Sequence, residues 1–333
     1  MIGSYYQRRR EKSKRTIAVL GGILILVCLV GAGIFVQCTP GTIAALLLPS
    51  STPTPTLTFT PTRTPTPTPL PTATLTPTPE VIEPQDHYWL SRPFGTGDNN
   101  EPTRYYPYGS TAGGRYRVHR GTDFPNPFGT SVLAAAKGRV IVAGTDDRIA
   151  YGERVGFYGQ LVIIQLEQKY HGQKVYVLYG HLSQVHVRFL QEVEEGNIIG
   201  EVGMSGVAIG PHLHVEVRVG ENTYQNTRNS QLWLRPLSGK GTIAGRLHDS
   251  QGQLIPQHPI SFYRQESPNQ RWQDVTTYPS SEVNADEEWE ENFVLGDVPI
   301  GDYLAKTYVN SHPYTAEVSV RGGETSFVVI AAR

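Results

Sequence analysis

The 333-residue sequence predicts a mainly β protein with one N-terminal transmembrane helix. From about residue 86 onwards, short runs rich in Val, Ile, Leu and Tyr alternate with Gly, Asp and Asn turns, as in strands joined by short loops. Helical periodicity is nearly absent there, apart from a short helical turn expected at 183–188. Closer to the N-terminus lies a long uncharged apolar run, followed by a Thr/Pro-rich stretch. This length allows two or three domains with their own cores.

The first 36 residues have the composition of a membrane anchor. Residues 17–36 carry no charge, and twenty helical residues span about 30 Å, the thickness of the hydrocarbon core of a bilayer. Residues 1–16 form a basic tail, which the positive-inside rule places in the cytoplasm. We therefore expect a single-pass protein of the cell membrane whose remaining parts are extracellular. The alternative is a cleaved signal peptide, but no small-residue cleavage site follows Val36.

Residues 37–85 are predicted to be a disordered spacer. Between residues 49 and 79 Pro alternates with Thr over much of the length, a composition that cannot form a core. In an extended polyproline conformation, at roughly 3.1 Å per residue, this stretch would reach on the order of 90 Å. Its predicted role is to hold the following domains away from the membrane.

Two β regions follow, at 86–238 and 239–333. The first contains strand-like runs at 131–135, 138–143, 161–166, 175–179 and 212–219. The second contains runs at 243–247, 260–263, 293–295, 303–309, 316–320 and 326–330. Short strands at this spacing, with Gly and Pro turns between them, predict a β-sandwich for the second region.

Charge and cysteine content exclude some functions. The formal net charge is −1, so the whole chain offers no electrostatic basis for binding nucleic acid. The two cysteines, Cys28 and Cys38, lie inside or beside the apolar segment. The exported part therefore has no disulfide, which a domain of this size does not require.

Three short segments contain the residue types of a catalytic zinc site: His119-Arg-Gly-Thr-Asp123, Tyr179-Gly-His181-Leu and Gly210-Pro-His212-Leu-His214. A zinc ion that catalyses hydrolysis is held by three protein ligands and keeps one position for water. Side chains that move protons must lie near that water. Four histidines and one aspartate divide into three ligands and two such helpers. On a strand, alternate residues point to one face, so His212 and His214 are expected to face one site.

The region from about residue 92 to 218 resembles the lysostaphin-type zinc metallopeptidases, which cut peptidoglycan cross-links. The similarity includes the three segments above, Gly129-Thr-Ser-Val-Leu-Ala, Lys137-Gly-Arg-Val-Ile-Val-Ala-Gly144 and the run from Gly196 to Gly206. It closes with Val-Glu-Val-Arg218 directly after the last histidine. So many ordered segments are not expected by chance.

The resemblance implies a function and a role for each candidate residue. His119, Asp123 and His214 would be the ligands of one Zn²⁺, and His181 and His212 the catalytic histidines. The fold would be an all-β peptidase domain with a groove over an antiparallel sheet, and the substrate a peptide cross-link of bacterial peptidoglycan. The expected function is thus a membrane-anchored zinc metalloendopeptidase.

Several alternatives stay open at this point. The first alternative is a non-catalytic wall-binding or activator protein that retains the peptidase fold without the activity. A purely structural zinc is a second alternative, although such sites favour four ligands and cysteine. Tyr105, Tyr106 and Tyr108 either line the groove or pack in the core. Residues 239–333 loosely resemble carboxypeptidase-regulatory, prealbumin-like sandwiches, which suggests a stabilising or wall-binding module, and no protein partner is identified.

Overall fold

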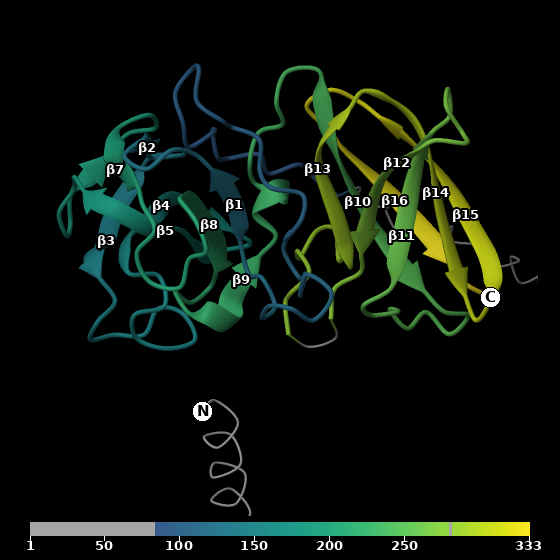
Figure 1. Ribbon diagram of the computed structural model, residues 1–333, viewed down its shortest axis with the longest axis horizontal. Helices are drawn as coiled ribbons and strands as arrows, with labels where there is room; N and C mark the ends of the chain where they lie inside the picture. The colour runs from purple at the N-terminus through teal and green to yellow at the C-terminus, as the bar shows by residue number, and fades with distance from the viewer. Residues whose placement is uncertain (1–83, 280–281) are drawn as a thin grey trace, which may run out of the picture. The chain divides into compact units, whose positions relative to one another are not determined.

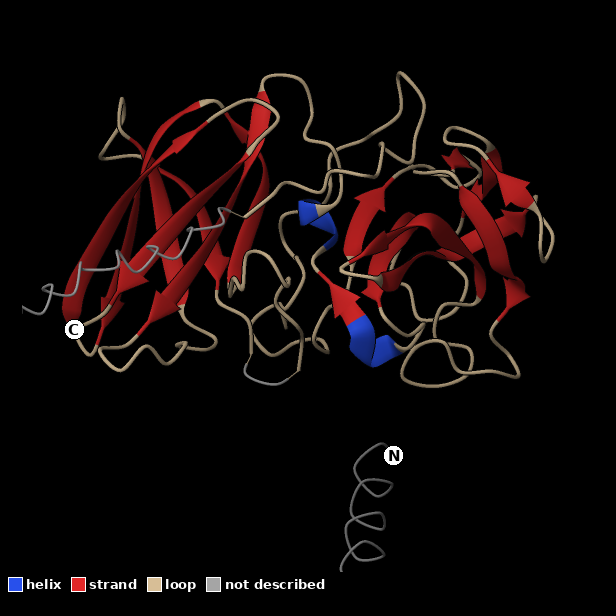
Figure 2. Ribbon diagram, turned by 180° about the vertical axis from the view of Figure 1, so that it is seen from behind, coloured by secondary structure: helices blue, strands red, loops and turns tan. Residues whose placement is uncertain are grey.

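The computed structural model describes residues 84–279 and 282–333. The basic tail, the transmembrane helix and nearly all of the spacer lie outside these residues, so those expectations remain predictions. Among the described residues no helix has the length and apolar character needed to cross a membrane. The prediction of a mainly β chain is confirmed for this part: its strands belong to three sheets, and its helices are two single 3₁₀ turns (Figures 1 and 2).

The first region is one nine-stranded sheet with the path β1-β8-β5-β4-β3-β6, in which β7 joins β2 to β5 and β9 pairs with β8. All of its pairings are antiparallel. Its strands are β1 (Thr122–Pro125), β2 (Ser131–Leu133), β3 (Gly138–Thr145), β4 (Gln160–Tyr170), β5 (Gln173–Val185), β6 (Glu192–Val193), β7 (Ile198–Val202), β8 (His212–Val219) and β9 (Thr227–Arg228).

Alternation of side chains along β8 determines which face of the sheet carries the core. Leu213, Val215, Val217 and Val219 are fully buried in the main apolar cluster, as the period of two predicts. The opposite face of β8 carries only polar side chains. The expected helical turn at 183–188 is wrong, because β5 continues to Val185 by pairing with β7. An alternating strand and an amphipathic turn are hard to distinguish over so few residues.

The second region consists of two sheets, β13-β10-β16 and β12-β11-β14-β15, that enclose one core. That core contains Phe293 and Ile243 from the first sheet, and Phe262 and Tyr303 from the second. The strands are β10 (Lys240–His248), β11 (Pro259–Arg264), β12 (Arg271–Thr276), β13 (Phe293–Pro299), β14 (Gly301–Val309), β15 (His312–Val320) and β16 (Thr325–Ala331). The architecture is a sandwich of two sheets, and the resemblance to prealbumin-like modules stays a prediction.

The two regions pack against each other through buried apolar side chains. Tyr278, Trp289 and Val294 of the second region belong to the same buried cluster as Trp233 and the strands of the first. Polar contacts reinforce this packing: the Tyr170 hydroxyl donates to Asp286 at 2.7 Å, and Arg92 forms an ion pair with Asp297 at 2.6 Å. Residues 84–279 and 282–333 thus belong to one compact unit.

The segment that leads into the first region is held by both regions. The Asp86 carboxylate accepts the backbone N–H of Thr325 at 3.2 Å, and the Tyr88 hydroxyl lies 2.6 Å from the Thr325 hydroxyl. His87 is buried, and its Nε2 lies 3.1 Å from Asp286 Oδ2. Further along, Leu90 exchanges backbone hydrogen bonds with Trp233 and Arg235.

Candidate active site

Three neighbouring strands bring the predicted site residues together. Asp123 on β1 lies directly opposite His214 on β8, and Gly180 on β5 lies opposite His214 from the other side. Directly opposed residues in an antiparallel pair have Cβ atoms about 5 Å apart, so their side chains meet. His119 precedes β1, where its backbone exchanges hydrogen bonds with Gly109 and Ser110.

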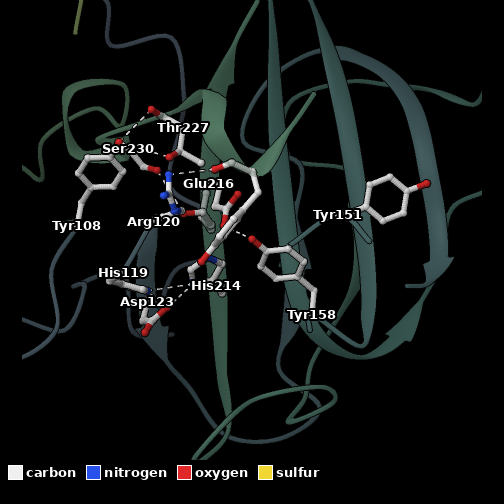
Figure 3. A network of polar contacts seen from close by, with 12 residues as sticks. Tyr108, His119, Arg120, Asp123, Tyr151, Tyr158, His214, Glu216, Thr227 and Ser230 are labelled. Carbon is white, nitrogen blue, oxygen red and sulfur yellow. Dashed lines mark hydrogen bonds and ion pairs between the residues drawn. The ribbon is translucent and has the colours of Figure 1, made fainter. Parts of the chain in front are cut away.

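The three predicted ligands converge at one point (Figure 3). His214 Nδ1 lies 2.7 Å from Asp123 Oδ1, and His119 Nε2 lies 3.1 Å from the same oxygen. The two imidazole nitrogens are 3.2 Å apart. His119 and His214 are buried, whereas Asp123 keeps partial access to solvent.

This arrangement fits a tetrahedral metal ion. Ligand atoms about 2.0–2.1 Å from a tetrahedral zinc lie about 3.3 Å from one another, close to the three distances observed. Burial alone would lower the pKa of His214, but its hydrogen bonds to Asp123 and Glu216 raise that pKa to about 9. Burial would likewise raise the pKa of Asp123, yet the neighbouring His119 and His214 hold it well below its usual range. The donor set therefore favours positive charge at this point.

His181 lies where β5 changes partner. Up to Gly180 the strand pairs with β8, and from Leu182 it pairs with β7. At this junction His181 has a φ of 62°, a strained value for a residue with a side chain. Its Nδ1 lies 2.8 Å from the Ser205 carbonyl, which can only accept, so Nδ1 carries the proton and Nε2 keeps its lone pair. Burial, followed by the nearby His214 and His212, lowers the pKa of His181 to about 3.

His212 is held in the same manner at the start of β8. Its Nδ1 donates to the Gly210 carbonyl at 2.8 Å, which leaves Nε2 3.7 Å from Asp123 Oδ1. The rings of His181 and His212 have centroids 4.9 Å apart. The structure therefore brings together all five residues predicted for the site, with two histidines beside the three converging ligands.

Sequence reasoning assigned no role to a buried network behind His214 (Figure 3). The other nitrogen of His214, Nε2, lies 3.1 Å from Glu216 Oε1, and Arg218 and Tyr158 bond to the same carboxylate. Burial would raise the pKa of Glu216, but Arg218, His214 and Tyr158 together lower it to about 2. The signal was present in the sequence, because the period of two that pairs His212 with His214 continues to Glu216 and Arg218.

A cavity of about 630 Å³ opens over these residues. One part of its lining is cationic, with Arg115, Arg117 and Arg120. Tyr106 also lines it and stacks on His119 with ring centroids 4.3 Å apart, whereas Tyr108 is buried in the core and Tyr105 is exposed. Sequence reasoning missed the arginines. The apolar part of the lining consists of Phe157, Val207, Ile209 and Tyr224.

The fold and the site define the class: a β-sheet domain with a His-Asp-His cluster that could hold a metal ion, and two further histidines beside it. Residues 117–227 match the family described as Peptidase family M23, so this part of the chain is a domain of that family. The match confirms the prediction of a lysostaphin-type peptidase domain.

Curated relatives share the same part of the chain. The DD-carboxypeptidase/endopeptidase Mpg of Neisseria meningitidis is 36% identical over 138 residues, which cover 41% of this chain and 26% of that protein. The peptidoglycan DD-endopeptidase ShyC of Vibrio cholerae is 32% identical over 143 residues, covering 43% and 29%. This chain therefore matches less than a third of the length of either relative.

Among solved structures, the catalytic domain of the M23 protein EnpA from Enterococcus faecalis is similar at 27% identity. The alignment covers 40% of this chain and 89% of that domain, with a TM-score of 0.32.

Proposed function

We propose that the protein is a zinc metalloendopeptidase that hydrolyses peptide cross-links of bacterial peptidoglycan. The observation that carries this proposal is the convergence of His119, Asp123 and His214 within about one metal coordination sphere, with two more histidines beside them. The M23 family match and relatives named peptidoglycan DD-endopeptidases support the substrate class.

His119, Asp123 and His214 would hold the ion. A zinc ion held there would supply Lewis acidity for polarising the scissile carbonyl and for lowering the pKa of an attacking water. His181 and His212 each present Nε2 as an acceptor, because their Nδ1 protons are committed to backbone carbonyls. One of them takes the proton of the attacking water, and the other, once protonated, delivers a proton to the leaving amine.

The lining of the cavity suits a peptide that carries carboxylates. Arg120 is fixed over the Tyr224 ring and donates to the Tyr224 carbonyl, and Arg117 is paired with Glu153. Arg115 has no ion-pair or hydrogen-bond partner within 84–279 and 282–333. A guanidinium left free at the edge of a cavity is well suited to bind a substrate carboxylate in a bidentate manner.

The test uses purified protein, zinc and defined peptidoglycans. We expect new amino groups to appear with the wild-type chain and none with His214→Ala, which should also lose its zinc. Mass spectrometry of the released fragments identifies the bond that is cut. A zinc-loaded wild-type chain that releases no amino groups from any of the peptidoglycans would refute the activity, and full zinc occupancy in His214→Ala would refute the ligand assignment.

We further propose that the chain is held in the cell membrane by residues 17–36, with the catalytic region outside. The uncharged apolar run, its basic flank and the Thr/Pro-rich spacer support this arrangement. Deleting residues 52–78 should reduce cleavage of intact wall by cells that carry the protein, and leave the rate on soluble peptides unchanged. A slower reaction on soluble peptides would mean that the spacer belongs to the catalytic part.

A further inference from the structure

We propose that Glu216 is a positioning residue that fixes the protonation pattern of His214 and thereby directs His214 Nδ1 at the metal. The proposal rests on the metal site of the proposed function, and extends it to a residue outside the group of His119, Asp123 and His214. It starts from the position of Glu216 on β8, two residues after His214 and therefore on the same face of the strand.

The His214 ring connects the site to Glu216. Its Nδ1 faces Asp123 at 2.7 Å, and its Nε2 faces Glu216 Oε1 at 3.1 Å. A neutral imidazole carries one proton, and a carboxylate accepts hydrogen bonds without donating. Both nitrogens face a carboxylate oxygen, but Asp123 is itself one of the groups that would hold the metal. When a metal ion takes the place of the Nδ1 proton, the remaining proton would stay on Nε2, where Glu216 accepts it, and the Nδ1 lone pair would face the ion.

Glu216 is itself held rigidly. Arg218 donates to Glu216 Oε2 from Nε at 2.9 Å and from its terminal nitrogen at 2.6 Å. The Tyr158 hydroxyl donates to Oε1. The Arg218 guanidinium is fixed in turn by the Tyr151 carbonyl at 2.8 Å and Asn222 Oδ1 at 3.1 Å. Glu216, Arg218 and Tyr158 are all fully buried, so water does not compete for these bonds.

The two oxygens of Glu216 have separate functions in this arrangement. Oε2 takes both hydrogen bonds from Arg218, which orients the carboxylate plane, while Oε1 is left to face His214 and Tyr158. A buried ion pair on its own contributes little net stability, so structural support alone is a weak reason to bury this one. A carboxylate oriented behind a metal-binding histidine fixes its tautomer and raises its basicity.

The decisive variant is Glu216→Gln. If the amide oxygen takes the place of Oε2 in front of Arg218, the amide NH₂ faces His214 Nε2 as a donor. His214 then carries its proton on Nδ1, where it opposes metal binding. We expect the zinc affinity of the full chain to fall roughly 10- to 100-fold, measured by competition with a chromophoric chelator at fixed pH and without any peptide substrate.

Two controls separate positioning from loss of stability. Glu291→Gln makes the same change at another fully buried glutamate that accepts from a tyrosine hydroxyl, Tyr278, but contacts no histidine of the site. Val217→Ala removes packing from the opposite face of β8, next to Glu216. Both controls should keep zinc affinity within about threefold of wild type, whatever happens to their melting temperatures.

The outcomes distinguish this proposal from the proposed function. Wild-type zinc affinity in folded Glu216→Gln, or an equal loss in Val217→Ala, overturns the positioning role. If Glu216→Gln does not fold, ¹⁵N spectra of the imidazole nitrogens in the zinc-loaded wild type decide: a proton on His214 Nε2 supports the role, and a proton on Nδ1 overturns it. A wild-type chain that binds no zinc refutes both proposals, whereas zinc binding without peptidase activity refutes the proposed function alone.

Discussion

At the scale of single residues, the four histidines of the site differ in what their ring nitrogens contact. His119 and His214 are buried and point ring nitrogens at the Asp123 carboxylate, whereas His181 and His212 commit Nδ1 to backbone carbonyls. In His181 and His212, backbone contacts thus determine which ring nitrogen is free. Substitution should therefore affect the two pairs differently.

We predict that His181→Ala and His212→Ala keep most of the zinc and lose about 10²-fold or more in rate, the usual scale for proton-transfer groups. Asp123→Ala, in contrast, should lose the metal itself, because it removes a converging ligand. Zinc content by elemental analysis and rates on a soluble cross-linked peptide check both expectations. Loss of zinc from a folded His212→Ala variant would reverse the roles of the two histidines on β8.

Glu291 makes the stability of the folded chain depend on pH. Burial raises the pKa of this carboxyl from 4.5 to about 8, so the folded state holds a proton that the unfolded state releases. The stability contributed by that proton is present below pH 4.5 and is lost as pH rises through about 8. Glu291→Gln should thus be more stable than wild type above pH 8, by a few kcal/mol at most, and should show no such advantage at pH 4.5.

Denaturant titrations of wild type and Glu291→Gln at several pH values test this prediction. The control is Asp286→Asn, because the pKa of the neighbouring Asp286 is lowered instead of raised, with burial opposed by its bonds to His87 and Tyr170. A gain from Glu291→Gln that is the same at every pH would contradict the assigned protonation.

At the scale of elements, the site depends on how closely β1 approaches β8. Gly121 precedes β1, and a Cβ there would lie 2.5 Å from the Val215 carbonyl oxygen and 2.6 Å from His214 Nε2. Both distances are shorter than van der Waals contact, so the backbone or the His214 ring would have to move. Glycine at this position allows β1 and β8 to pack this closely.

We therefore predict that Gly121→Ala weakens zinc binding by at least tenfold and lowers the melting temperature, because the methyl group displaces His214 or separates the strands. Chelator competition and thermal unfolding measure the two effects. Gly95→Ala is the matched control, since a Cβ at that position meets only Asp98 Oδ2 at 3.8 Å. Equal behaviour of the two variants would show that the β1–β8 spacing is not critical.

The same strands show how much of the site was predictable from sequence. Alternation predicted that His212 and His214 share a face, and β8 has the bounds expected for that strand. The three segments suggested one site by their residue types alone. The division into ligands and helpers depended on the family resemblance, since no local pattern reveals that β1 and β5 flank β8. The φ of His181 also escaped prediction, because it results from a change of strand partner rather than from local preference.

At the scale of the whole molecule, the two β regions depend on each other. Sequence composition separated them near residue 238, because each has its own run of strands and turns. It could not show that Trp289 and Tyr278 fill the same core as Trp233, since such contacts join residues distant in the chain. The second region therefore contributes buried side chains to the core of the peptidase domain.

We predict that residues 84–238 alone melt on the order of 10 °C or more below residues 84–333, because truncation exposes buried side chains such as Trp233 and Tyr170. Thermal unfolding of both forms tests this expectation. Trp289→Ala in the longer form should show part of the same loss. Identical melting of the two forms would mean that the peptidase domain is self-sufficient.

The contacts made by residues 86–90 also determine which part of the catalytic unit bears a mechanical load applied at its N-terminal end. Tension applied at residue 84 acts first on the contacts to Thr325 and Asp286, and next on the backbone bonds to Trp233 and Arg235. None of these four residues lies on β1, β5 or β8. We expect a chain pulled from residue 84 in an optical trap to lose the contacts of this segment while β1, β5 and β8 stay intact. Tension on a chain tethered at this end is therefore borne by residues 86–90 before it reaches the strands that carry the site residues.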